Sequence, residues 1–556
     1  MKFSDLNQLE NDVVIETDLC IVGSGPAGLS IAKEFANTNI QVWIIESGGL
    51  KEDADTQTLY AIESIGVPRV MQQEILRYRI WGGTSHIWTG RCAPFDEIDF
   101  QHRDWVPYSG WPISRHELNP YLERASYNLG LGPNCYDERL WKQFGVQRPR
   151  LTLDPTLLKS AFWQFSKHPN TPNEPTRFGR GFLPPIADNI HVLLHANVTH
   201  INTNSVGKQV QSIEVSTLHH KRAQIKAKAF VLCCGGIENA RLLLASNRYI
   251  PNGVGNHYDR VGRFLMDHAG CVLGTFNPRR SAAVQNLFGH YWLDDAQKRH
   301  VYLHGVALSP ALQAKEQLLN CAAYLEVFPA LNEPWQAIMR LTKSIKQTGL
   351  SRSLYPDTLA VASQLPDIAH GLYRRKVKHR PPITKADRIE LWCLTEQPPD
   401  PDSRVTLSDQ KDALGMPLSK LNWKISNQER RSVQRLSHLI VQEFQRLGLP
   451  QPDLADWLNA DDNWQSHFIE RAHPTGTTRM SAIPQDGVVD ANCQVHGVEG
   501  LFIAGSSIFP TAGHANPTLM IVAMAIRLAD RLKSHHFNSP LVEVGDWATA
   551  EKSGVG

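Results

Sequence analysis

Residues 18–28 read DLCIVGSGPAG, an apolar run that leads into three glycines, and a second apolar run ends at Glu46. The pattern predicts a βαβ nucleotide-binding unit. In such a unit Gly23 permits the tight turn, Gly25 lets the backbone approach a pyrophosphate, and Gly28 lets the helix pack on the strand. The helix N-terminus then faces the phosphates. A carboxylate at Glu46 accepts hydrogen bonds from a ribose 2′-hydroxyl and repels a 2′-phosphate, which favours FAD or NAD over NADP.

The length of the chain indicates how many domains to expect, and its composition does not indicate a function. The 556 residues exceed the roughly 250 to 300 that one core supports, so we expect two domains or one domain with an elaborate second lobe. Lysine plus arginine number 57 against 55 aspartate plus glutamate, which gives no reason to expect a nucleic-acid partner. The nine cysteines include no Cys-x-x-Cys pair and no metal-ligand spacing, so we predict neither a metal site nor a redox dithiol.

The amino-terminal residues carry no targeting signal that we recognise. Residues 1–12 are polar, with neither an apolar signal segment nor a twin arginine. No apolar run in the chain approaches the ~20 residues that span a bilayer. We therefore expect a soluble, cytoplasmic protein without a transmembrane segment.

Two further segments resemble parts of a ligand-binding fold. Residues 79–90, RIWGGTSHIWTG, place paired glycines among aromatic and hydroxyl side chains. This favours a backbone pressed against a flat ligand, or a glycine turn stabilised by tryptophan packing. Strands are predicted over 190–194, 210–216 and 229–232, and Gly235 and Gly236 then open a helix over 238–246. This second strand, glycine and helix junction belongs with the first domain.

Residues 271–463 are predicted to form the other lobe. Within it, residues 403–407 and 417–425 are predicted to be strands of a sheet, and a proline-rich turn over 398–401 precedes them. Residues 335–380 are predicted to be helical and basic. That segment would present either a solvated face or a surface for a membrane or an acidic partner.

The carboxy-terminal part carries the strongest chemical signal. His473 begins a polar turn, HPTGTTRM, and a predicted strand over 501–504 leads into Gly505. Residues 513–517, GHANP, then lead into a helix that runs to about residue 533. Proline after Asn516 is a strong helix-start signal, so the positive end of that helix is available to a group above Asn516.

These motifs follow one another in the order found in the glucose-methanol-choline (GMC) family of FAD oxidoreductases, which the chain resembles from about residue 15 to 535. The Trp88-Thr89 pair, the Asn516-Pro517 pair and the 403–407 strand are most similar to the pyranose oxidase, fructose dehydrogenase and gluconate dehydrogenase branch. The resemblance implies FAD in an extended form, with the adenine near Val198 and the isoalloxazine against 83–89 and the Asn516 helix. It assigns to the cofactor Gly23, Gly25, Pro26, Ala27, Gly28, Glu46, Ser47, Gly83, Thr84, Ser85, Trp88, Thr89, Val198, Gly235, Gly505, Ser506, Pro517 and Thr518.

The resemblance also implies two catalytic residues. His473 falls where the family places its base, and Asn516 where it places a second histidine or asparagine. A neutral imidazole suits the removal of a hydroxyl proton near pH 7. Plainer readings remain open: His473 as a turn histidine, Asn516 as a helix cap, His514 as the second histidine, and His86 as a packed residue or as a contact to flavin or substrate.

One departure from the family bears on how the cofactor is attached. Pyranose oxidases carry a flavin-linking histidine immediately before the tryptophan of the Trp-Thr pair, whereas this chain has Ile87 there and His86 one position earlier. A shift of one residue in an extended segment turns a side chain to the other face. We therefore predict non-covalent FAD.

The predicted fold class is α/β, with a discontinuous Rossmann-like FAD-binding domain and a second α+β substrate domain on a largely antiparallel sheet. The FAD-binding domain would comprise residues 1–100, 186–270 and 464–556, the last part with the catalytic residues. Residues 101–185 would cover the FAD and begin the substrate lobe, and residues 271–463 would form the substrate-binding domain.

The predicted activity is oxidation of an alcohol group, on a sugar, glycoside or polyol-like substrate, to a ketone or aldehyde. His473 would remove the proton while hydride passes to flavin N5. Oxygen, a quinone-like molecule or a separate redox protein would reoxidise the flavin, since the chain has no cysteine cluster or haem motif of its own. The alternatives are a non-redox lyase of the same fold, a dehydrogenase subunit that passes electrons to a separate protein, a NAD-dependent dehydrogenase that uses only the first motif, and a non-enzymatic flavin-binding subunit.

Overall fold

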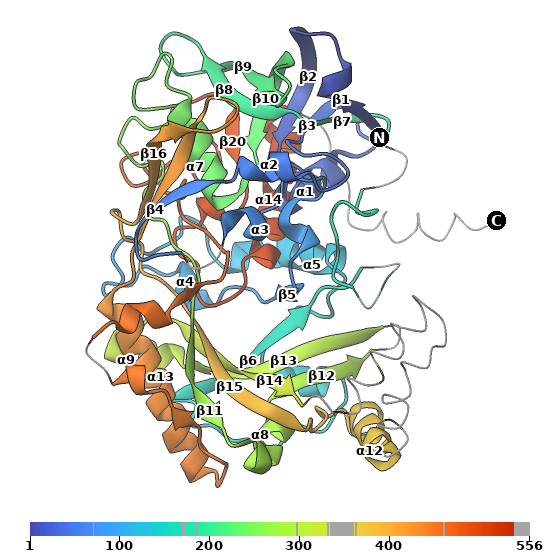
Figure 1. Ribbon diagram of the computed structural model, residues 1–556, viewed down its shortest axis with the longest axis vertical. Coiled ribbons are helices and arrows are strands. Elements are labelled where there is room, and N and C mark those ends of the chain that lie inside the picture. Colours follow the sequence, from blue (N-terminus) through green and yellow to red (C-terminus); the bar gives the residue numbers. More distant parts are fainter. Residues whose placement is uncertain are drawn as a thin grey trace, which may run out of the picture.

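The computed structural model describes residues 1–69, 72–168, 171, 174–183, 187–295, 298–330, 333, 338, 361, 364–459 and 462–538. Two large sheets dominate it, one in the upper and one in the lower half of Figure 1. Most of the basic segment predicted over 335–380 lies outside the described residues. Its described part contains helix α12 (Leu365–Lys376), which is mostly exposed.

The first sheet has eight strands and is mainly parallel. Its order is β1-β7-β3-β2-β10-β9-β8, and β20 also pairs with β10. Only the β10–β9 and β9–β8 pairs are antiparallel. The strands are β1 (Lys2–Asp5), β2 (Val13–Val22), β3 (Val42–Ile45), β7 (Ile190–Leu194), β8 (Asn197–Thr203), β9 (Val210–Ser216), β10 (Arg222–Leu232) and β20 (Leu501–Ile503).

The glycine fingerprint folds as predicted, between β2 and helix α1 (Pro26–Phe35). The last four residues of β2 are all buried, as expected for a strand with helices on both sides. Helix α14 (Thr518–Arg531) buries nine residues and contacts both α1 and α5 (Asn119–Asn128). Helix α7 (Gly235–Ala245) follows β10, so the second predicted strand, glycine and helix junction also forms.

The second sheet has nine strands, and all of its pairs are antiparallel. Its path runs β18-β11-β15-β14-β13-β6-β5, with β12 beside β13 and β19 beside β11. The strands are β5 (Arg91–Cys92), β6 (Leu158–Phe165), β11 (Ala269–Phe276), β12 (Gly289–Asp294), β13 (Arg299–Leu308), β14 (Cys321–Pro329), β15 (Ala386–Thr395), β18 (Asp453–Leu454) and β19 (Ile469–Glu470). The two sheets together confirm the predicted fold class.

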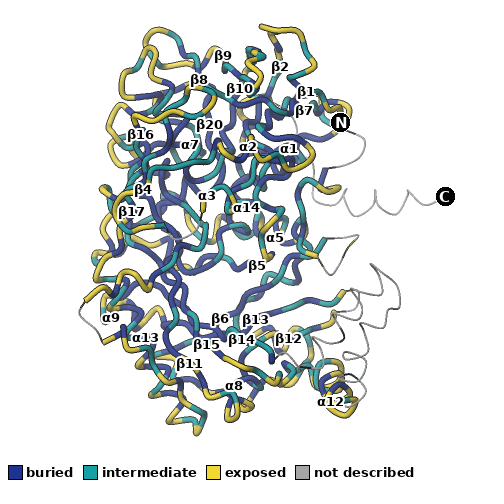
Figure 2. Tube along the Cα trace, viewed as in Figure 1, coloured by how far each residue is buried: buried dark blue, intermediate teal, exposed yellow. Residues whose placement is uncertain are grey.

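Helix α13 (Asn427–Arg446) packs against β14 and β15 of the second sheet. A capping box formed by Ser426 and Glu429 fixes its first turn. One continuous hydrophobic core includes residues of both sheets, for example Val22 and Leu273. Figure 2 accordingly shows buried residues along the strands of both halves and exposed residues on the outer loops and on α12.

The two strands that we predicted within residues 271–463 do form, as part of a third sheet. The strands expected over 403–407 and 417–425 do not join the second sheet. They form β16 (Arg404–Lys411) and β17 (Pro417–Trp423), which make a separate sheet with β4 (Ile62–Gly66). This three-stranded sheet contacts α7 on the side of the nucleotide-binding fold. Because β17 pairs in parallel with a strand from the start of the chain, no local pattern could reveal its partner.

Candidate active site

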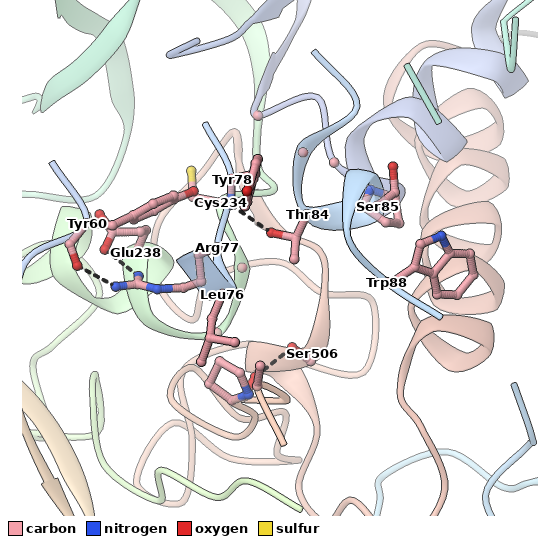
Figure 3. A pocket seen from close by; sticks show the side chains of 18 of the residues that line it. Tyr60, Leu76, Arg77, Tyr78, Thr84, Ser85, Trp88, Cys234, Glu238 and Ser506 are labelled. Atoms are coloured by element: carbon pink, nitrogen blue, oxygen red, sulfur yellow. Dashed lines mark hydrogen bonds and ion pairs between the residues drawn. The ribbon is translucent and has the colours of Figure 1, made fainter. Parts of the chain in front are cut away.

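A cavity of ≈ 720 Å³ connects the loops of the first sheet with the face of the second. At one end its wall includes the turn between β2 and α1, the end of β3 and the start of α7. At the other end are the turn at His473, the N-terminus of α14, and side chains of β14 and β15. Its volume lies within the usual range of small-molecule sites. Figure 3 shows side chains along part of this wall.

The glycines at the first end have different surroundings. A Cβ on Gly25 would meet nothing within 4 Å, whereas one on Gly28 would lie 2.0 Å from the backbone oxygen of Gly23. Gly25 therefore faces open space at the start of α1, and Gly28 provides the close packing of helix on strand. This division is the one expected of a dinucleotide fingerprint.

Glu46 is held at the end of β3 by the loop that it faces. Its carboxylate accepts hydrogen bonds from the backbone N–H and hydroxyl of Ser24 at 3.0 and 2.6 Å, and from the N–H of Gly48 at 2.8 Å. Burial raises the pKa of Glu46, although these hydrogen bonds act in the opposite direction. The carboxylate is thus fixed in the wall beside Gly25.

Most of the predicted site residues line this single cavity. Those that do are His473, Asn516, Gly23, Gly25, Pro26, Glu46, Ser47, Gly83, Thr84, Ser85, Trp88, Thr89, Val198, Gly235, Ser506, Pro517 and Thr518. Ala27, Gly28 and Gly505 do not. Ala27 and Gly28 are turned into the packing of α1, and Gly505 caps the short helix that begins at Ser506. The segment predicted to press on a flat ligand contains a short 3-10 helix over Gly83–His86, and two residues that follow it, Ile87 and Trp88, reach the wall.

An arginine cluster that we did not predict forms another part of the wall. Arg77, Arg79 and Arg241 each place a guanidinium nitrogen within 3.0 to 3.2 Å of the Glu238 carboxylate. Burial disfavours the charge on Glu238, but the three arginines lower its pKa to about 2. Figure 3 shows Arg77 between Glu238 and the backbone oxygen of Tyr60. The cluster fixes the segment at residues 77–79 to the first turn of α7.

His473 lies in contact with two polar side chains. Its Nδ1 is 3.1 Å from Nδ1 of His268, and its Nε2 is 3.4 Å from Nδ2 of Asn516. The Asp267 carboxylate accepts the backbone N–H of both histidines, at 2.8 Å for His268 and 3.0 Å for His473. Arg69 binds the other oxygen of Asp267 at 3.2 Å. Asp267, which Arg69 holds in place, therefore fixes the backbone of the two histidines relative to each other.

The hydrogen-bond partners determine which nitrogen of His473 carries a proton. Nε2 of His268 is 3.3 Å from the carbonyl oxygen of Ala512, which can only accept, so this nitrogen is N–H. Nδ1 of a neutral His268 is then an acceptor, and Nδ1 of His473 must be the donor to it. This leaves Nε2 of His473 unprotonated, and its lone pair accepts the N–H of the Asn516 amide.

The surroundings of His473 also keep it neutral. Burial lowers the pKa of His473 well below its ordinary value of 6.5, and His268, Arg471 and Arg91 lower it further by charge repulsion. Burial lowers the pKa of His268 as well. The Oδ1 atom of Asn516 is buried without a protein partner. The cavity wall thus offers a proton acceptor and an amide oxygen side by side.

The other two candidate histidines are structural in this arrangement. His514 lies outside the cavity wall, with Nε2 3.6 Å from Asp96 and its ring against Trp163. Nε2 of His86 is 2.9 Å from the carbonyl oxygen of Trp81, and this ring does not reach the wall either. Neither takes the position beside His473 that Asn516 occupies.

The residues that we missed come from segments without a recognisable motif. His268 and Asp267 immediately precede β11, Arg91 belongs to β5, and Arg471 follows β19. In the sequence, each of these residues is an ordinary polar residue outside any recognised motif. The adjacent Asp267 and His268 were the only available signal, and nothing local connected them to His473.

Comparison with known proteins gives two family matches, each described as GMC oxidoreductase. They cover residues 179–270, matching the N-terminal part, and residues 399–525, matching the C-terminal part. The chain is 24% identical to the fructose dehydrogenase large subunit of Gluconobacter japonicus, over 93% of this chain and 98% of that protein. It is 23% identical to 2-methyl-1,2-propanediol dehydrogenase of Mycolicibacterium austroafricanum, over 93% of this chain and 95% of that protein.

A solved structure of a formate oxidase has the same fold. It superposes with a TM-score of 0.57 at 16% identity, over 95% of this chain and all of that one. Within the described part of the chain, no group of three His, Cys, Asp or Glu residues could hold a metal ion. Among those same residues, every helix is too short or too polar to cross a membrane.

Proposed function

The chain belongs to the GMC oxidoreductases, and on that premise we propose that it oxidises an alcohol group of a sugar, glycoside or polyol-like substrate to a ketone or aldehyde. The observation that carries the proposal is the unprotonated Nε2 of His473, which lies beside Asn516 on the cavity wall. A positioned neutral imidazole is the group that alcohol oxidation needs to accept the hydroxyl proton.

The cavity fits FAD. Gly25 and Gly235 both leave open space where a Cβ would stand, at the starts of α1 and α7. Backbone N–H groups at such helix starts bind phosphate oxygens, and Glu46 beside them suits a ribose hydroxyl. The residues that would hold FAD are the predicted ones that line the wall, from Gly25 to Thr518. When bound, FAD would supply the acceptor for the hydride.

The protein's own part in the reaction is to position the substrate and to move a proton. His473 accepts the hydroxyl proton on Nε2, and the resulting imidazolium keeps its Nδ1–H donated to His268. Asn516 holds the substrate oxygen through its amide. The N-terminus of α14, at Thr518, stabilises negative charge that develops at this end of the cavity.

We propose that the cofactor is bound without a covalent link. The only histidine in the segment over residues 79–90 is His86, whose Nε2 is engaged by the Trp81 carbonyl. Ile87, which occupies the position before the tryptophan, lines the wall instead and offers no nucleophile. Acid precipitation should therefore release the yellow cofactor into the supernatant, and a pellet that stays yellow would contradict this.

An anaerobic screen tests the proposed activity. Sugars, glycosides and polyols are mixed with the purified yellow protein without oxygen, and the ~450 nm flavin band is followed. At least one alcohol should bleach the band. Air is then admitted, and rapid return of the colour would identify oxygen as an acceptor, whereas slow return would favour a quinone-like molecule or a separate redox protein. A protein that turns over substrate without bleaching would be a non-redox enzyme of this fold, contrary to the proposal.

A further inference from the structure

Two arginines form part of the cavity wall near His473, on the side of the second sheet. Arg91 belongs to β5, and Arg471 immediately follows β19. The guanidinium of Arg91 lies over the ring of Tyr324 at 4.2 Å from its centroid, and that of Arg471 lies over Trp392 at 4.9 Å. Both rings also line the cavity. The aromatic faces hold the two cations in place without neutralising them.

Neither guanidinium has a carboxylate within 4.0 Å among the described residues, and neither donates a hydrogen bond there. The arginines elsewhere around this site are paired. Arg69 binds Asp267, Arg103 donates to Glu396 at 2.8 Å, and Arg77 binds Glu238. Arg91 and Arg471 are half-buried at the cavity wall. The ten N–H groups of Arg91 and Arg471 are therefore available to a ligand.

The remaining charges of this wall limit what that ligand can be. Glu326 of β14 also lines the cavity, so the two arginines and this carboxylate leave a net charge of one positive unit. The nearby Glu390 is already engaged by Arg388 and by Trp392 Nε1. A single carboxylate matches one unit of positive charge, while a phosphate monoester, at about −1.5 to −2, exceeds it.

We propose that Arg91 and Arg471 bind a carboxylate of the substrate, so that the alcohol which the enzyme oxidises belongs to an acidic sugar or another polyhydroxy acid. This inference rests on the proposed function, since it assigns a substrate class to the same site. Guanidinium forks bind carboxylates through parallel N–H···O bonds, which would fix the orientation of the substrate as well as select its charge.

The anionic group would also assist His473. The positive charges of Arg91 and Arg471 oppose protonation of this imidazole. A carboxylate bound by these two arginines offsets that repulsion, and so raises the pKa of His473 at the moment when it must accept a proton. A neutral alcohol brings no such compensation.

Binding to the FAD-loaded protein tests the inference with three probes: D-glucuronate, D-glucose and glucose 6-phosphate. Isothermal titration should show glucuronate binding roughly 10- to 100-fold more tightly than glucose, the value expected of hydrogen bonds to a charged group. Arg91→Met and Arg471→Met should each remove most of that difference, and Arg471→Lys should retain part of it. Arg375→Met is the matched control, because this arginine also lies over an aromatic ring, 4.1 Å from the centroid of Trp292, but does not line the cavity.

Each other outcome overturns the inference. Equal affinity for glucuronate and glucose, no binding of glucuronate, tighter binding of glucose 6-phosphate, or variants of Arg91 and Arg471 that behave like Arg375→Met would each do so. Flavin content and circular dichroism of the variants verify that they are folded. Anaerobic flavin reduction separates the two proposals: arginine-dependent glucuronate binding without reduction by any alcohol contradicts the proposed function alone, while reduction by neutral alcohols with no charge preference contradicts this inference alone.

Discussion

The two ends of the cavity are built in different ways. At one end, Gly25 and Glu46 come from one short stretch of chain, and the requirements on its glycines fall on the backbone: a turn, a close approach and a helix start. The end at His473 is assembled from side chains that are far apart in sequence, with His268 205 positions before it. Backbone requirements select glycine and leave a local pattern, whereas a side-chain network leaves none. We therefore expect removal of single side chains to impair function at the second end. At the first end, we expect added side-chain atoms at the glycines to do so.

Removing the imidazole should have the largest effect. His473→Ala should lower the rate of anaerobic flavin reduction by about 10²- to 10⁴-fold, the usual contribution of a general base. FAD should stay bound, because the cofactor end does not depend on this side chain. Stopped-flow absorbance measures the rate, and the spectrum of the purified variant measures the FAD content. His257→Ala, at an exposed histidine, is the control. An unchanged reduction rate in His473→Ala would show that the base lies elsewhere.

Replacing the histidine behind His473 should have the next largest effect. His268→Ala removes the acceptor that fixes the tautomer of His473, and loss of such an orienting partner typically costs about 10- to 100-fold in activity. His268→Asn should restore much of the rate, since its amide oxygen can accept the same Nδ1–H. The comparison of kcat with KM and of the pH profiles for the two variants checks this. Equal losses in both variants would mean that His268 serves packing alone.

Two glycine variants should separate folding from binding at the other end. In Gly28→Ala the new methyl group would lie 2.0 Å from the Gly23 oxygen, so stability should fall by about 1 to 3 kcal/mol, as for other overpacked sites. Gly25→Ala meets no protein atom within 4 Å and has a φ of −71°, so the protein should remain as stable without cofactor while binding FAD more weakly. Thermal unfolding of the cofactor-free proteins and titration with FAD give the two quantities. The pair would fail to support this division if both variants lost stability equally.

The smallest expected effect is on the pH profile. Because burial and the neighbouring cations hold the pKa of His473 below 6.5, its Nε2 stays unprotonated as the pH falls through that value. As the pH is lowered, kcat/KM should therefore start to fall only below pH 6.5. A steady-state profile with any accepted alcohol measures this. A limb centred at the ordinary histidine value would indicate a solvated base.

The sequence predicted the elements whose cause is local. The strand and helix around the fingerprint, the start of α14 after Pro517 and the α/β class all follow from apolar runs, glycines and a helix-start signal. His473 and Asn516, predicted from the order of the motifs, do lie on one cavity wall. The pairing of β17 with β4 and the contacts of His268, Arg91 and Arg471 were not predicted, because each depends on segments that meet only after both sheets have formed.

The position of β20 has a consequence for biosynthesis. This strand pairs with β10, and in the same region Asn239 donates to the hydroxyl of Ser507, 268 positions later. A nascent chain that has just released β10 already contains its partners β2 and β9, but it lacks β20, which pairs with Phe230–Leu232. At roughly 5 to 20 residues per second, this short strand edge must then wait many seconds for its partner. The first sheet should accordingly be completed only when synthesis of the chain is nearly finished.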